Sequence, residues 1–249
     1  MDKKQQIQNE QYNYPYHYIP FENEGRFSQT QHWSWGFRYL GGLNVVLDQL
    51  KEINFSSLID VGCGDGRFLK EVGEQYPYSE LIGVDYSERA INIAKAMNPQ
   101  ITYDAVNILH DSIDRSFDIA TAIEVLEHIP PKSLPQFVGA ISEIINDGGY
   151  FILTVPHENK RVSEKHYQHF TSAKLKNLLS PHFKNIDFIP FDTKSHLLGL
   201  LSKIIGGKGN HFVITNQKIN NWFFNLYRKR YLYTNDVSKC LRIAAVCQK

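Results

Sequence analysis

Between residues 55 and 160, short apolar runs alternate with segments whose apolar side chains recur every three or four positions. The runs predict buried strands and the periodic segments predict helices. We expect strands at 58–61, 80–84, 101–108, 117–123 and 150–156, and helices from 68 onward, over 88–97 with Ser87 as its cap, and over 134–145. Beyond this region, Thr171 is expected to cap a helix over 172–179. This alternation favours an α/β fold, a mainly parallel sheet with helices on both faces, whose ligands bind beyond the carboxyl ends of the strands.

The first predicted strand ends in a turn rich in glycine. Asp60 is followed by glycine at positions 62, 64 and 66. Only glycine lets a ligand approach the backbone this closely. The dinucleotide fingerprint G-x-G-x-x-G would need glycine at position 67, where the chain has Arg67. Asp85 ends the next strand, where a carboxylate suits the two hydroxyls of a ribose. These residues predict a nucleoside ligand.

Two segments together resemble the class I S-adenosylmethionine (SAM) dependent methyltransferases. The segment Asp60-Val61-Gly62-Cys63-Gly64-Asp65-Gly66 resembles motif I of that family. Phe117-Asp118, followed by Glu124-Val125-Leu126-Glu127-His128-Ile129, is typical of members that act on small molecules, including those of ubiquinone biosynthesis. The resemblance implies a Rossmann-like, seven-stranded sheet. Residues 185–191 and 241–247 would supply its two remaining strands, the last of them antiparallel.

The resemblance also implies which residues hold SAM. The glycine turn would pass under the methionine moiety, and Asp85 would bind the ribose. Asn107 with Ile108 would contact the adenine, and Asp104 competes for that place. Arg38, in an amphipathic segment over 31–53, would pair with the SAM carboxylate. The predicted cofactor residues are Asp60, Gly62, Cys63, Gly64, Asp85, Tyr86, Asn107, Ile108, Glu124 and Arg38.

Histidines supply the candidate chemistry at the methyl acceptor. Methyl transfer from a sulfonium needs alignment, and an oxygen nucleophile must also lose its proton, which suits histidine. His128, just past the fourth strand, is the predicted general base; the alternative is a structural histidine that holds the loop. An arm rich in tyrosine and proline over 12–21 either packs on the domain or closes over the acceptor. The predicted acceptor-binding residues are Tyr14, His17, His157, His166 and His169.

A metal site is an alternative use of the same segment. Glu124, Glu127, His128 and the downstream His166 carry oxygen and nitrogen ligand atoms. Small-RNA 3′-terminal 2′-O-methyltransferases have a similar E-x-x-E-H, with a distant histidine, that binds Mg²⁺. Mg²⁺ or another divalent ion is therefore an alternative second cofactor. However, E-x-x-E-H also occurs in methyltransferases without that RNA activity.

Composition narrows the expected partners and location. Lys plus Arg number 27 and Asp plus Glu 26, a formal net charge of +1, which gives no basic footprint for nucleic acid. The three cysteines fit neither a disulfide framework nor a metal-ligand spacing and suit a reducing compartment. No apolar run reaches the roughly 20 residues that span a bilayer, and no signal peptide is visible, so we expect a cytoplasmic protein.

The predicted organisation has three parts. Residues 1–52 form an N-terminal arm and helical cap, in which 1–11 are expected to lack regular structure. Residues 53–192 and 240–249 form the SAM-binding core, and residues 193–239 form an insertion. The insertion is expected to be a lid over the acceptor site, a contact between copies in a homo-oligomer or, because 221–231 is aromatic and then basic, a peripheral membrane contact.

These observations lead to the hypothesis of a SAM-dependent methyltransferase with a small-molecule acceptor. The insertion and the aromatic arm resemble methyltransferases of bacterial surface-glycan pathways. That resemblance favours O-methylation of a sugar, nucleotide-sugar or glycan substituent in polysaccharide biosynthesis. The alternatives are a phenolic quinone precursor, an RNA 2′-hydroxyl methylated with the help of a metal, and SAM binding without turnover.

Overall fold

The structure, a computed structural model, describes residues 3–10, 12, 15–23, 26–28, 33–205 and 216–249. The strands are β1 (Phe21–Asn23), β2 (Arg26–Ser28), β3 (Ser57–Val61), β4 (Glu80–Asp85), β5 (Thr102–Ala105), β6 (Phe117–Ile123), β7 (Ile145–Pro156), β8 (Asn185–Thr193) and β9 (Cys240–Gln248). The helices are α1 (Lys3–Glu10), α2 (Trp33–Leu50), α3 (Arg67–Gln75), α4 (Glu88–Met97), α5 (Leu134–Glu143), α6 (Ser172–Leu179), α7 (His196–Ile205) and α8 (Gln217–Arg230).

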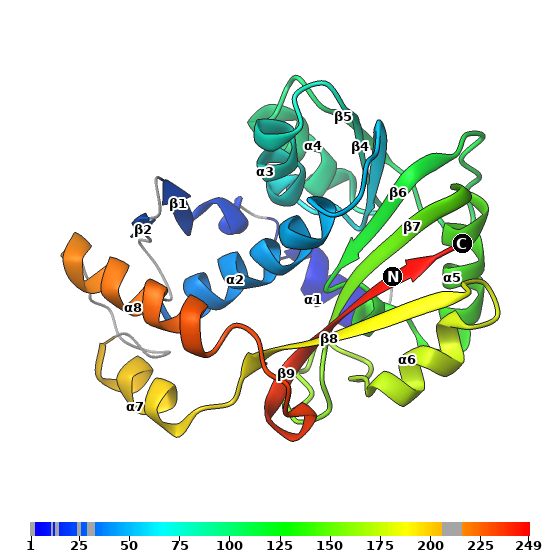
Figure 1. The fold of residues 1–249 in the computed structure, drawn as a ribbon. Helices are drawn as coiled ribbons and strands as arrows, with labels where there is room; N and C mark the ends of the chain where they lie inside the picture. The colour runs from blue at the N-terminus through cyan, green and yellow to red at the C-terminus, as the bar shows by residue number, and fades with distance from the viewer. Residues whose placement is uncertain (1–2, 11, 13–14, 24–25, 29–32, 206–215) are drawn as a thin grey trace.

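The central sheet has seven strands in the order β5-β4-β3-β6-β7-β9-β8 (Figure 1). The pairs from β5 to β7 are parallel, whereas β9 runs antiparallel to both of its neighbours. This confirms the expected Rossmann-like sheet with an antiparallel last strand. Because β3 and β6 are adjacent and the chain leaves them in opposite directions, their carboxyl ends form the crevice where such sheets bind ligands.

Alternation along the central strands divides the core between the two faces of the sheet. Leu58 and Ile152 belong to one buried cluster, whereas the residues next to them, Ile59 and Leu153, belong to the other. The first cluster contains apolar side chains of α2, α3, α4, α7 and α8, and the second those of α5 and α6. Figure 1 shows α5 and α6 together on their side of the sheet.

Two predicted helix starts have the expected caps. The Ser87 hydroxyl accepts a hydrogen bond from the Ala90 N–H, and the Thr171 hydroxyl accepts one from the Lys174 N–H. Each cap satisfies one of the N–H groups that a helix N-terminus leaves without a helical partner. The cap at residue 87 matters for the site, because it fixes the chain directly after Asp85.

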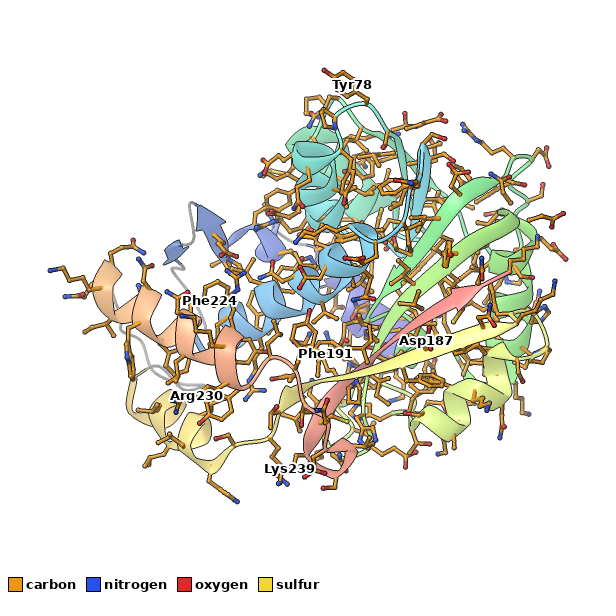
Figure 2. The ribbon with its side chains drawn as sticks, viewed as in Figure 1. Tyr78, Asp187, Phe191, Phe224, Arg230 and Lys239 are labelled. Atoms are coloured by element: carbon orange, nitrogen blue, oxygen red, sulfur yellow. The ribbon has the colours of Figure 1, made fainter. Side chains whose placement is uncertain are left out.

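The insertion predicted over 193–239 packs into the same core as the N-terminal helix. The Phe37 ring in α2 lies 4.9 Å from the Phe223 ring and 4.8 Å from the Tyr227 ring, both in α8. Phe224 and Phe191 are buried in this cluster as well (Figure 2). The roles expected for the insertion, as a lid, an oligomer contact or a membrane contact, stay predictions. Within the described residues, no helix has the length and apolarity to cross a membrane.

The N-terminus differs from the sequence-based expectation that residues 1–11 lack regular structure, because Lys3–Glu10 form helix α1. This helix has no apolar face of its own, and tertiary hydrogen bonds hold it instead. The Lys4 ammonium donates to the carbonyl oxygens of Glu164 and His166, both at 2.8 Å. The Ser87 hydroxyl donates to the Asn9 side chain. Composition alone does not reveal such partners.

Candidate active site

One cavity of about 420 Å³ opens at the carboxyl ends of β3, β4 and β6. All of the predicted cofactor residues line it. The glycine turn and Asp85 form one part of the lining, which we call the glycine-turn end. Glu124, Glu127, His128 and His166 form another part, which we call the histidine end.

The glycines of the turn are required by its conformation and by close contacts. Gly62 has φ 77° and Gly64 has φ 58°, in the left-handed region where other residues are strained. A Cβ on Gly62 would lie 2.6 Å from the Val125 side chain, and one on Gly64 would lie 2.6 Å from the Tyr12 hydroxyl. A side chain at either position would therefore be strained and would clash with a neighbouring side chain.

Asp85 is held at the glycine-turn end by two main-chain donors. The Gly64 N–H donates to one carboxylate oxygen at 3.1 Å, and the Ser87 N–H donates to the other at 2.9 Å. Burial raises the pKa of Asp85 to about 6, and these hydrogen bonds act in the opposite direction. Of the two candidates for the adenine amino group, Asn107 lines the cavity, whereas Asp104 is exposed and does not.

Asp60 lies behind the turn and connects two strands. Its carboxylate accepts a hydrogen bond from the Thr121 hydroxyl at 2.7 Å, which links β3 to β6. The residue is 2% exposed, and burial raises its pKa to about 7. The nearby charge of Asp85 acts in the same direction. The glycine-turn end thus holds two buried acids, Asp60 and Asp85, with raised pKa values.

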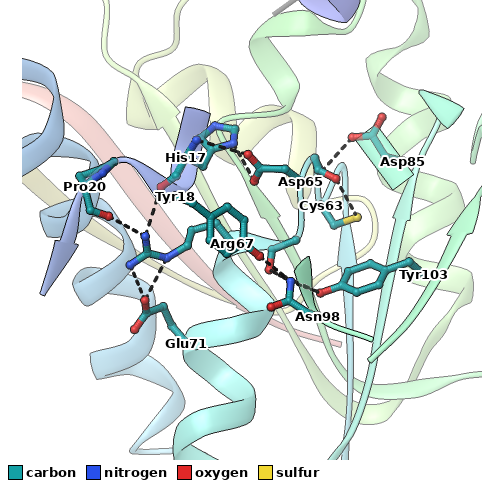
Figure 3. A network of polar contacts seen from close by, with 12 residues as sticks. His17, Tyr18, Pro20, Cys63, Asp65, Arg67, Glu71, Asp85, Asn98 and Tyr103 are labelled. Carbon is teal, nitrogen blue, oxygen red and sulfur yellow. Dashed lines mark hydrogen bonds and ion pairs between the residues drawn. The ribbon is translucent and has the colours of Figure 1, made fainter. Parts of the chain in front are cut away.

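Part of the N-terminal region lies across this end of the cavity; we call α1, Tyr12 and residues 15–20 the N-terminal strap. His17 Nδ1 lies 2.9 Å from the Asp65 carboxylate, and the His17 N–H donates to the same group at 3.2 Å (Figure 3). The Arg67 guanidinium pairs with Glu71 and donates to the carbonyls of His17 and Pro20. The residue that breaks the dinucleotide pattern therefore anchors the N-terminal strap.

At the histidine end, two histidines and a glutamate converge from distant parts of the chain. Glu127 and His128 belong to a turn of 3₁₀ helix after β6, and His166 comes from the loop before α6. One ligand atom from each of the three lies within 4.8 Å of the other two. The rings of His128 and His166 meet edge to face at 4.8 Å. Glu124 lines the same cavity but is not part of this group.

The groups at the histidine end are poorly solvated. Glu127 is 1% exposed, and within the described part of the chain neither of its carboxylate oxygens has a hydrogen-bond partner. Burial, reinforced by the charge of Glu124, raises the pKa of Glu127 well above its usual range. Burial also lowers the pKa of His128 to about 4 and that of His166 to about 2, with Lys165 contributing to both shifts. Both imidazoles are therefore neutral at neutral pH.

Two of the predicted acceptor-binding residues are not brought to the cavity by the described structure. His157 and His169 are buried but do not line it. His157 accepts a hydrogen bond from the Asn159 N–H, and His169 Nε2 lies 2.8 Å from His166 Nδ1. Tyr14 lies outside the described residues. His17 and His166 do line the cavity.

Sequence reasoning missed a buried ion-pair network on the cavity wall. The Asp192 carboxylate accepts hydrogen bonds from Arg38 and from the Tyr227 hydroxyl, and it lies 3.5 Å from Arg242 Nε. Arg38, Asp192 and Arg242 all line the cavity. The sequence could have drawn attention to Arg242, because it is the lone charged residue in the apolar run 241–247. Nothing in the sequence around Asp192 pointed to the cavity.

Comparison with known families decides what kind of domain this is. The sequence model of a family described as methyltransferase domain matches residues 33–202. The chain belongs to this family. The match includes the glycine turn, Asp85 and the segment from Glu124 to His128. It confirms the expected relationship to the SAM-dependent methyltransferases, with SAM as the cofactor.

Individual relatives of this methyltransferase are distant. The ubiquinone biosynthesis O-methyltransferase of Nitrosomonas europaea is 28% identical over 158 residues, 57% of this chain and 65% of that protein. The enzyme of the same name from Idiomarina loihiensis is 31% identical over 109 residues, 41% and 43% of the two chains. The chain thus spans less than two thirds of either relative's length.

A solved structure agrees with the fold of this methyltransferase. The N-methyltransferase NodS from Bradyrhizobium japonicum WM9, in complex with S-adenosyl-L-homocysteine (SAH), matches with a TM-score of 0.63 at 13% identity. The match covers 100% of this chain and 99% of that chain. At this identity the likeness shows a common fold.

Proposed function

We propose that the protein transfers a methyl group from SAM to a hydroxyl oxygen of a small polar acceptor. The observation that carries this proposal is that one cavity is lined by the glycine turn and Asp85 at one end and by neutral histidines at the other. A cofactor bound at the first end and an acceptor bound at the second would meet inside the cavity, which is the proximity that methyl transfer needs.

The lining of the glycine-turn end fits SAM. Gly62 and Gly64, which line the cavity, are the proposed contacts of the methionine moiety, and the Asp85 carboxylate is the proposed partner of the ribose hydroxyls. Asn107 and Ile108 flank the place for the adenine, and Arg38 is the proposed partner of the SAM carboxylate. When bound, SAM supplies an activated methyl group on its sulfonium sulfur.

His128 is the proposed proton acceptor for the acceptor hydroxyl. Its Nδ1 lies 3.1 Å from the Lys165 carbonyl oxygen, which can only accept, so Nδ1 carries the proton. Nε2 then keeps its lone pair. Because burial lowers the pKa of His128 to about 4, the ring is neutral and able to accept a proton over the physiological range.

The acceptor we favour is a sugar, a nucleotide-sugar or a glycan substituent. Buried carboxylate oxygens of Glu124 and Glu127 have no partner within the described residues, and several hydroxyl donors on one acceptor would satisfy them. Lys160 and Lys165 also line this end and add donors. A phenolic quinone precursor, which the names of the relatives suggest, has fewer hydroxyl donors. It is our second choice of methyl acceptor.

Metal-assisted transfer is the second candidate, favoured by the close approach of Glu127, His128 and His166. An ion bound there would lower the pKa of a coordinated acceptor hydroxyl, which is an advantage where the histidines are weak bases. Treatment with EDTA followed by readdition of Mg²⁺ or Mn²⁺ tests this candidate. If turnover survives EDTA unchanged, the metal has no part in the reaction.

A methyl-transfer screen with labelled SAM tests the proposal directly. The acceptors are nucleotide sugars, free sugars, catechol-type phenols and short RNAs. We expect label in the sugar fraction. The variant His128→Ala should lose about 100-fold or more in turnover and keep its affinity for SAH. Label only in phenols or RNA would overturn the acceptor assignment, and binding of SAM with no label in any class would favour SAM binding without turnover.

A further inference from the structure

The charged residues of this chain are distributed unevenly. Residues 193–235 contain seven Lys and Arg and no Asp or Glu, whereas the rest of the chain contains 20 Lys and Arg and 26 Asp and Glu. The formal net charge of +1 is therefore the balance of a basic segment and an acidic remainder. The basic segment includes α7 and α8 and belongs to the insertion. A concentration of one sign of charge attracts partners of the opposite sign.

Helix α8 has two sides of different character. Its buried side consists of Asn220, Phe223, Phe224 and Tyr227. Lys218, Trp222 and Lys229 follow one another at intervals of four and seven positions, so they share another side of the helix. All three are exposed, Trp222 to 57%. This helix therefore presents an indole ring between two ammonium groups to its surroundings.

The cations on this side of α8 are not neutralised by the protein. Arg228 pairs with Glu22, at 2.7 Å. Lys218, Lys229 and the exposed Arg230 form no ion pair within the described residues. Their charges are therefore available to an anionic partner.

Helix α7 adds exposed apolar side chains. Leu198 is buried in the same cluster as Phe223, whereas Leu197 is 51% exposed and Leu200 is 56% exposed. Ten large apolar side chains are exposed in the described part of the chain, and five of them belong to residues 193–235. A single exposed leucine is ordinary, but this segment makes up only 43 of the 249 residues. Such a concentration marks a surface that a partner covers.

The two helices lie away from the reaction site. They pack on the side of the sheet opposite to α5 and α6 (Figure 1). None of their described residues lines the cavity. A partner bound to the outer sides of α7 and α8 would therefore leave the cofactor and the acceptor untouched.

We propose that α7 and α8 form a docking face for an anionic lipid surface, with the cations on the headgroups and the apolar side chains at the boundary with the acyl chains. We call this the basic helical face; it comprises Leu197, Leu200, Lys218, Trp222, Lys229 and Arg230. Tryptophan suits this depth because its ring is apolar and its N–H is a donor. Of the roles expected for the insertion, this is the peripheral membrane contact. It does not rest on the proposed function.

Two other occupants fit the basic helical face less well. A symmetric contact with a second copy would place the face against itself and bring like charges together. A nucleic acid would neutralise the cations but would leave Leu197 and Leu200 without an apolar partner. A lipid surface offers anionic headgroups and hydrocarbon together, so it matches both properties of the face.

Flotation of the full chain with lipid vesicles tests the proposal without SAM or acceptor. One set of vesicles is phosphatidylcholine alone, and the other contains about one third phosphatidylglycerol, which is anionic. We expect binding to the anionic vesicles and little to the neutral ones. Affinity should fall more than about 10-fold as salt is raised from about 0.05 M to about 0.5 M, because salt screens the headgroup charge.

A triple variant tests the cations of the face. The substitutions Lys218→Gln, Lys229→Gln and Arg230→Gln should each weaken binding by about 5-fold, and together by about 100-fold. The matched control replaces three exposed lysines outside the insertion and lowers the net charge equally; it combines Lys95→Gln, Lys176→Gln and Lys184→Gln. The control should bind the anionic vesicles nearly as tightly as the wild type.

A single variant tests the apolar part of the face. Trp222→Ala should weaken binding to anionic vesicles by about 10-fold, because the ring no longer enters the lipid. Tyr78→Ala is the control, since Tyr78 is 100% exposed and lies on a different part of the surface from Arg230 (Figure 2). That control should bind like the wild type. Every variant is first checked for a wild-type melting profile and SAH affinity.

Several outcomes would overturn the proposal. These are equal binding to neutral and anionic vesicles, equal loss in the two triple variants, and unchanged binding in Trp222→Ala. Tighter binding to short RNA than to vesicles, or self-association that the triple variant of the face abolishes, would assign the face to another partner. Vesicle binding as expected, with no methyl transfer to any acceptor, would support the lipid contact while the proposed function fails.

Discussion

At the glycine-turn end of the cavity Asp60 and Asp85 have hydrogen-bond partners, whereas at the histidine end several buried oxygens have none among the described residues. Asp85 accepts from two backbone N–H groups, and Asp60 accepts from a hydroxyl. By contrast, both oxygens of Glu127 and one of Glu124 lack partners among the described residues. The first end is complete before a ligand arrives, and the second leaves buried groups for a ligand to satisfy.

This difference has an energetic side. A buried polar group without a partner costs on the order of 1–3 kcal/mol. Folded chains retain such groups mainly at functional sites, where activity is kept at the expense of stability. The glycine-turn end should therefore govern affinity for the cofactor, and the histidine end should govern turnover. The following predictions separate the two, starting with the largest effect.

Replacing Glu127 with glutamine should lower turnover by about 100-fold or more, because a buried carboxyl group that lines the histidine end is lost. SAH affinity should stay within a factor of about two. The melting temperature should rise, since a buried carboxyl group that is costly to ionise is replaced by an amide that does not ionise. Turnover assays, calorimetric titration with SAH and thermal melts measure the three effects. A drop in SAH affinity as large as that in turnover would show that the two ends are not separate.

Replacing Asp85 with asparagine should weaken SAH binding by about 30-fold, equivalent to about 2 kcal/mol, through loss of charged hydrogen bonds to the ribose. Asp104→Asn is the matched control, because Asp104 is an exposed acid on the adjacent strand β5. That control should bind SAH like the wild type. Equal affinities of the two variants would exclude Asp85 as the ribose ligand.

The acids at the glycine-turn end should also give the apo-protein a characteristic pH dependence. The pKa of Asp60 is raised from 3.8 to about 7, so its contribution to stability is fully present below pH 3.8 and is lost as the pH rises toward 7. Asp60→Asn removes this loss. Its stability relative to the wild type should increase by about 2 kcal/mol between pH 5 and pH 7. Urea titrations at the two pH values measure the change, and a constant difference would contradict it.

The smallest expected effect concerns the N-terminal strap. His17→Ala removes the contact with Asp65, which is worth little where it is partly exposed, so SAH should dissociate about 2-fold to 5-fold faster. His110→Ala, which changes an exposed histidine that does not line the cavity, is the control. Stopped-flow displacement of SAH gives the rates. An unchanged rate in His17→Ala would mean that the N-terminal strap does not retain the ligand.

The sequence predicts the glycine-turn end well because its determinants are local. Glycines at fixed spacing, a strand that ends in Asp85 and a cap at Ser87 are features of consecutive residues, and the sheet follows from their alternation. The choice between Asp104 and Asn107 needed the structure, because both lie near the end of the same predicted strand.

The histidine end is less predictable because it depends on how side chains turn within one irregular loop. His157, His166 and His169 look equivalent in sequence, yet only His166 lines the cavity. No periodicity applies to such a loop, so orientation cannot be read from spacing. Helix α1 was missed for a related reason, since Lys4 in it donates to carbonyl groups more than 150 positions away.

The network of Arg38, Asp192 and Arg242 has a consequence for how the protein folds. It joins residues that are 154 and 204 positions apart and sets them on the cavity wall. Contacts at such separation require the closure of long loops before they add any stability. During refolding, the capacity to bind SAH should therefore return later than helical circular dichroism.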